Sequence, residues 1–151
     1  MDNHRILCFG FNDVLVENLV PTLASEVAYL FWIRDELGRE DALPSNIETI
    51  DFQDAYQANF SDNPIADLSR VNLDDDAISC YFELRPKVLK MIERLERHGP
   101  KQPYDTRVYT FHCLFTYWYS FLISKKINYY VGSNVPHEVT DFVITELCKL
   151  I

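Results

Sequence analysis

The segment "GSNVPHE" follows an apolar run and holds four residues that can bind a polar ligand or move a proton: Ser133, Asn134, His137 and Glu138. The positive end of a helix dipole favours a neutral imidazole, which can accept a proton or donate a hydrogen bond. His137 and Glu138 are therefore candidate catalytic residues, and the first two are candidate substrate ligands. A simpler interpretation stays open, in which Pro136 begins a helix and Glu138 only complements its dipole.

A second polar segment, "GFNDVLVE", follows the apolar run "RILCF" and contains three candidate substrate-binding residues: Asn12, Asp13 and Glu17. Free backbone N–H groups at the start of a helix can hold a ligand hydroxyl or a phosphate. Asp13 can also be explained as a plain helix cap. The chain has four glycines and neither a G-x-G-x-x-G nor a Walker sequence, so neither a dinucleotide site nor a P-loop is indicated.

The elements that must position these segments alternate along the chain. Apolar runs predict strands over residues 5–11, 26–33, 46–52 and 127–132, and helical spacing predicts helices over 14–24, 78–95, 105–126 and 136–151, the second of them kinked or interrupted at Pro86. This alternation predicts one α/β domain over residues 1–151: a Rossmann-like three-layer sandwich with a mainly parallel four-stranded sheet, order 3-2-1-4, and helices on both faces. Such sheets bind ligands beyond the carboxyl ends of the strands where the order reverses. Both polar segments are expected there, side by side.

Composition limits the class of partner. The net charge is −9, and the acidic residues concentrate in residues 1–79, which hold 16 acidic and 4 basic side chains. Such a chain repels nucleic acid, so nucleic acid is not an expected partner. The exception is a basic helical stripe of Lys87, Lys90, Arg94 and Arg97. It is either a solvated face, paired with Glu83 and Glu93, or a contact with a phosphate-bearing partner or an anionic membrane surface.

Targeting and metal signals are missing from the sequence. No apolar run reaches the ~18 residues of a membrane-spanning helix, and "MDNHR" does not resemble a secretory signal, so a cytoplasmic location is expected by default. Four scattered cysteines lack the spacing of a zinc site or a redox pair: Cys8, Cys80, Cys113 and Cys148. They are predicted to be reduced and buried, and no metal or cofactor is expected.

The segments "ILCFGFNDVLVENL", "VAYLFWIRDE", "NIETIDFQDAY" and "VGSNVPHEVTDFVI" resemble, in this order, the first domain of bacterial and phage glycosyltransferases of the GT-B type, which are associated with capsular or surface polysaccharide synthesis. The resemblance implies that this domain receives the saccharide acceptor, while a second Rossmann-like domain binds the nucleotide sugar. It further implies that His137 and Glu138 face the cleft and that Asn12 and Asp13 lie on the acceptor side. A base in this cleft would deprotonate an acceptor hydroxyl without a metal.

The chain departs from this type because it contains no second domain, so on its own it is expected to be inactive as a transferase. Two other hypotheses remain. One is a non-catalytic interaction module whose acidic half contacts a basic partner. The other is a small independent enzyme or nucleotide-binding protein that uses the same crevice. The oligomeric state stays open.

Overall fold

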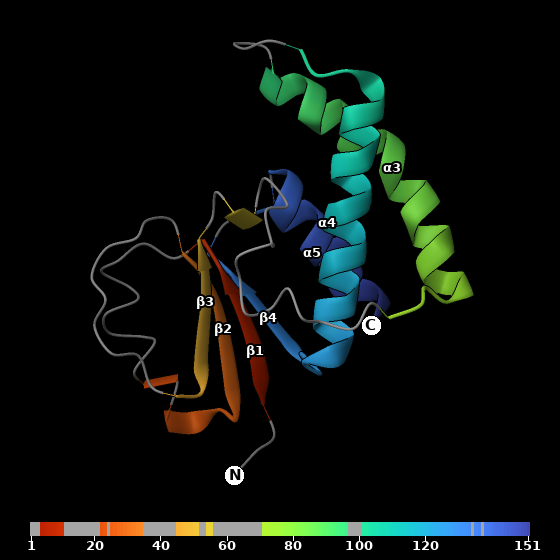
Figure 1. Ribbon diagram of the computed structural model, residues 1–151. Coiled ribbons are helices and arrows are strands. Elements are labelled where there is room, and N and C mark those ends of the chain that lie inside the picture. Colours follow the sequence, from red (N-terminus) through yellow and green to blue (C-terminus); the bar gives the residue numbers. More distant parts are fainter. Residues whose placement is uncertain are drawn as a thin grey trace.

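Four parallel strands form one sheet in the computed structural model (Figure 1). The structure describes residues 4–10, 22–23, 25–34, 45–51, 54–55, 71–96, 101–133, 135–136 and 138–151. The strands are β1 Arg5–Phe9, β2 Tyr29–Arg34, β3 Ile47–Asp51 and β4 Tyr129–Gly132. They pair in the order β3-β2-β1-β4, and all three pairings are parallel. The predicted α/β class, the sheet order and the Rossmann-like topology are confirmed.

The strand boundaries differ from the prediction mainly in β2. The apolar pattern predicted a strand from residue 26, but Ser25 and Glu26 are helical and β2 begins at Tyr29. Pairing sets this boundary, since Arg5 at the start of β1 lies opposite Tyr29. The backbone N–H of Ala28 donates to the carbonyl of His4 at 2.9 Å, which aligns the chain just before the strand.

Three helices lie on one side of the sheet: α3 Asp75–Leu95, α4 Tyr104–Ser124 and α5 Val139–Leu150 (Figure 1). A carboxylate caps the first of them, because the Asp74 side chain accepts a hydrogen bond from the backbone N–H of Ala77 at 2.8 Å. The same carboxylate accepts the hydroxyl of Tyr119 at 3.1 Å and so joins α3 to α4. Helix α3 runs through Pro86 without interruption. Pro86 is exposed, so water can reach the carbonyl that loses its partner.

The main core lies between the sheet and these helices. Alternate strand residues point into it, among them Leu7, Phe31 and Ile33, which are almost completely buried. Helix α4 supplies Trp118 and Phe121, and the ring centroids of Phe31 and Phe121 are 4.5 Å apart. The nearly continuous apolar sequence of α4 is explained by this position, because different sides of the helix contact Phe31 of the sheet, α3 and α5.

The opposite face of the sheet carries a second, smaller cluster, made of Ile6, Cys8, Leu30, Trp32 and Ile47. Leu23 and Val27 pack against it, and residues 22–23 and 25–26 are helical. Both faces of the sheet are therefore buried, which explains why β1 and β2 are apolar apart from the terminal Arg5 and Arg34 and do not alternate.

Candidate functional site

The turns that follow β1 and β4 meet at the carboxyl edge of the sheet. The backbone N–H of Ser133 donates to the carbonyl of Phe9 at 3.1 Å. The Ser133 hydroxyl donates to the carbonyl of Gly10, across 123 positions of sequence. β1 and β4 are neighbours at the point where the sheet order reverses. We call these two turns, which contain Gly10 and Ser133, the rim. Parallel α/β sheets bind ligands at this place.

Backbone conformation fixes the first turn of the rim. Gly10 has φ 76°, in the left-handed region that residues with a Cβ rarely occupy. This conformation ends β1 directly after Phe9 and turns the Gly10 carbonyl toward Ser133. The turn itself therefore favours a glycine at the start of "GFND".

The second turn ends in a capped helix whose start differs from the prediction. Pro136 was expected to be the first helical residue, but α5 begins at Val139 and Glu138 is its N-cap. Glu138 and Asp141 form a capping box, in which the backbone N–H of Glu138 donates to Asp141 Oδ1 at 2.9 Å. The pair E-x-x-D was the sequence signal for this start. It gives Glu138 a structural role in addition to the catalytic role predicted for it.

Two of the seven predicted site residues, Ser133 and Glu138, belong to the described chain and lie in the second turn of the rim. The other five fall outside the described residues: Asn12, Asp13, Glu17, Asn134 and His137. Ser133 is exposed. Its hydroxyl hydrogen is used by Gly10, so its oxygen can still accept a hydrogen bond from a ligand. Val135, which lies between Ser133 and Glu138 in the sequence, is 84% exposed.

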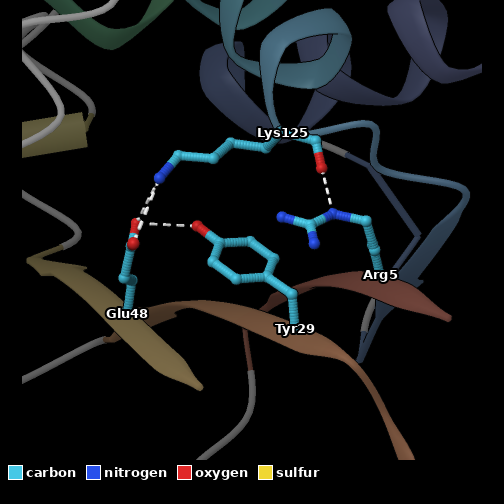
Figure 2. Close-up of polar contacts among 4 residues, drawn as sticks. All are labelled: Arg5, Tyr29, Glu48 and Lys125. Atoms are coloured by element: carbon cyan, nitrogen blue, oxygen red, sulfur yellow. Dashed lines mark hydrogen bonds and ion pairs between the residues drawn. The ribbon is translucent and has the colours of Figure 1, made fainter. Parts of the chain in front are cut away.

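A separate polar cluster, which the sequence did not reveal, lies at the amino end of the sheet (Figure 2). The amino-end cluster consists of Arg5, Tyr29, Glu48 and Lys125. Tyr29 donates its hydroxyl hydrogen to Glu48 Oε2 at 2.7 Å, and Lys125 Nζ donates to both carboxylate oxygens of Glu48, at 2.9 and 3.1 Å. Arg5 Nε donates to the Lys125 carbonyl. The Arg5 guanidinium lies 4.5 Å from the centre of the Tyr29 ring and the Lys125 ammonium 5.3 Å, so two cations contact the same ring.

These contacts favour the uncharged form of Tyr29. Burial raises the pKa of Tyr29 above its ordinary value, and the hydrogen bond to Glu48 and its negative charge add to the rise, against a smaller lowering by Arg5. The polar groups of the cluster satisfy one another and join the end of α4 to three strands. Its four members are far apart in the sequence, so no spacing rule could have found them. We interpret the cluster as structural.

The cysteines and acidic residues that the structure describes form no metal centre. The described residues contain no group of three potential metal ligands. All four cysteines are free; Cys8 is buried as predicted, whereas the other three are only partly buried. Burial raises the pKa of both Cys8 and Cys148 to about 11, so neither thiol is primed for nucleophilic chemistry at neutral pH.

The basic stripe is exposed along α3 as far as the structure describes it, at Lys87, Lys90 and Arg94; Arg97 lies outside the described residues. Glu93, predicted to pair with Arg97, has one carboxylate oxygen 3.9 Å from Arg107 of α4. None of the helices in the described part of the chain combines the length and hydropathy needed to cross a membrane.

Comparison with known proteins adds no relative. A scan of protein-family models, a search of curated proteins and a search of solved structures each find no match to this chain. The class that the fold and the rim define is a Rossmann-like α/β domain with its candidate site where β1 and β4 end.

Proposed function

We propose that this chain is the acceptor-side domain of a GT-B-type glycosyltransferase that acts in the synthesis of capsular or surface polysaccharide. The observation that carries the proposal is the contact between Gly10 and Ser133. It joins the turn before Asn12 and Asp13 to the turn before His137, as an acceptor site assembled from these two segments requires. The Rossmann-like sheet supports the same assignment.

In the proposed reaction, the acceptor is a saccharide hydroxyl held at the rim. Ser133 accepts a hydrogen bond from the acceptor, and Asn12, Asp13, Glu17 and Asn134 are the further ligands. His137 takes the hydroxyl proton as the acceptor oxygen attacks the anomeric carbon of a nucleotide sugar. The bond from that carbon to the phosphate breaks, and the nucleoside phosphate leaves with the electron pair. A second Rossmann-like domain binds the nucleotide sugar.

Within this scheme Glu138 acts through its position. Its backbone N–H is held by Asp141 at 2.9 Å, so the residue next to His137 is anchored to the first turn of α5. A general base must stay within hydrogen-bond reach of the proton that it removes. The capping box thus gives the proposed base a rigid support.

The test is sugar transfer by the native gene product, measured with a panel of nucleotide sugars and oligosaccharide acceptors. His137→Ala is expected to lower kcat by about 10²- to 10⁴-fold, the usual contribution of a general base. His112→Ala is the matched control, because His112 is an exposed histidine of α4. Equal transfer rates for the two variants would remove the catalytic assignment of His137, and a native protein that transfers no sugar would favour the interaction module.

A further inference from the structure

A cavity of about 450 Å³ lies between the helices, near the second turn of the rim. Its lining includes Leu95 and Glu96 from the end of α3, Gln102 from the segment before α4, Thr110 of α4, and Val139, the first residue of α5. Val139 directly follows Glu138, so the cavity adjoins the proposed acceptor site. Its volume lies within the range of about 300–1,000 Å³ that small-ligand sites occupy.

The chemical feature of this cavity is the carboxylate of Glu96. Only 10% of the Glu96 side chain is exposed, and within the described residues neither of its oxygens receives a hydrogen bond. Glu96 is also the C-cap of α3, where the helix dipole disfavours a negative charge. Buried carboxylates are normally hydrogen-bonded, and stability alone does not favour one at this position.

Arg107 offsets the negative charge of Glu96 but donates no hydrogen bond to its carboxylate. Arg107 Nε lies 3.3 Å from Glu96 Oε2, yet it donates its hydrogen bond to the carbonyl of Gln102, at 3.1 Å. An uncompensated buried carboxylate would attract a cation, whereas this one already has a cation beside it. The complementary ligand is therefore neutral and offers hydrogen-bond donors.

The remaining lining narrows the class of ligand. The Thr110 hydroxyl donates to the carbonyl of Thr106 at 3.1 Å, which leaves its oxygen as an acceptor. Leu95 and Val139 add apolar surface. A pyranose ring combines these properties, since it carries several neutral hydroxyl donors around C–H groups that can pack on apolar side chains.

We infer that this cavity is a subsite for a neutral sugar unit, with Glu96 accepting its hydroxyl hydrogens. The inference rests on the proposed function in taking the ligand to be part of the saccharide acceptor. It goes beyond that function by assigning a second binding position, away from the reacting hydroxyl. An acceptor of more than one sugar unit would occupy the rim and the cavity together.

The test is a titration of this chain, followed by amide ¹H–¹⁵N spectra, with methyl glycosides of glucose, galactose and mannose. Glucosamine and glucuronic acid serve as charged comparators. At least one neutral glycoside should shift the amides of Glu96, Arg107 and Thr110, and should bind more tightly than either charged sugar. Absence of these shifts with every neutral glycoside, or a preference for glucosamine, would overturn the inference.

Two matched variants locate the binding. Glu96→Gln should weaken the glycoside by about tenfold or more, the usual effect of losing hydrogen bonds to a charged group. Glu93→Gln makes the same change in charge on the same helix and near the same arginine, but Glu93 is 53% exposed and does not line the cavity. It should change the dissociation constant by less than about twofold. Equal losses in the two variants would overturn the assignment of Glu96.

A further variant covers the case in which Glu96→Gln does not fold. Thr110→Leu fills the cavity from α4 and should also abolish the shifts; unchanged binding in this variant would place the sugar elsewhere.

The result of this test can be distinguished from the result of the test of the proposed function. If a glycoside binds at Glu96 and His137→Ala keeps full transfer activity, only the catalytic assignment at the rim is wrong. If His137→Ala loses transfer activity and no glycoside binds at Glu96, only the assignment of the subsite is wrong.

Discussion

The two ends of the sheet are built by different means. At the amino end, four side chains bond to one another in the amino-end cluster shown in Figure 2. At the carboxyl end, the rim is held largely by backbone groups: the left-handed Gly10, and the carbonyls of Gly10 and Phe9, which accept hydrogen bonds from Ser133.

The difference separates a structural polar site from a candidate binding site. Both carboxylate oxygens of Glu48 accept hydrogen bonds from Tyr29 or Lys125, so the amino-end cluster has little hydrogen-bonding capacity left for a ligand. The rim leaves the exposed Ser133 oxygen able to accept a further hydrogen bond. Hydrogen-bonding capacity that the fold does not consume is the better guide to function than the number of polar residues.

The largest expected effect on stability comes from breaking the amino-end cluster. Tyr29→Ala removes a side chain that is only 7% exposed, together with its bond to Glu48, and should lower the free energy of unfolding by about 3 kcal/mol. The control is Tyr129→Ala, since Tyr129 is likewise the first residue of its strand but is 50% exposed. It should cost less than about 1 kcal/mol. Urea unfolding measures both. Similar losses would show that the amino-end cluster contributes no special stability.

A smaller effect appears at alkaline pH. The pKa of Tyr29 is raised in the folded protein by burial and by Glu48, so this tyrosine ionises more readily in the unfolded chain. Its stabilising contribution is complete below about pH 10 and falls as the pH rises further, by up to about 1.4 kcal/mol per pH unit. Tyr29→Phe should therefore show a shallower loss of stability between pH 10 and 11 than the native protein. Parallel profiles in urea unfolding would contradict the proposed environment of Tyr29.

The smallest effect tests the rim. Gly10→Ala places a Cβ on a backbone with φ 76° and should cost about 1 kcal/mol. Gly132→Ala is the control at the neighbouring strand end. Its new Cβ would meet the Tyr130 hydroxyl at 3.2 Å, the movable end of a side chain, and the expected cost is smaller. Thermal or urea unfolding compares the two. A larger loss for Gly132→Ala would mean that backbone conformation is not what shapes the rim.

Much of the fold could be predicted because its signals are local. The apolar runs around Leu7 and Phe31 indicated strands buried on both faces, as the two clusters on the sheet confirm. The errors are at boundaries. β2 begins at Tyr29 because pairing with β1 sets its register, and α5 begins at Val139 because the capping box outweighs the preference of proline for the first helical turn.

The candidate site was predictable only as a meeting of two turns. The order of the strands required the segments after β1 and β4 to be neighbours, and Gly10 and Ser133 are. The binding and catalytic roles of all seven predicted site residues, Ser133 and Glu138 included, remain predictions. The buried carboxylate of Glu96 gave no sequence signal, because a glutamate near the end of a charged helix is usually solvated.

The amino-acid sequence by itself determined the alternation of strands and helices and, through it, the parallel sheet and the position of the rim. These follow from hydrophobic periodicity and capping, which act over a few residues. Only the tertiary structure decided that Lys125 meets Glu48 and that Arg107 stands beside Glu96. Such contacts depend on how whole elements pack, and the same side chains on a differently packed helix would face solvent.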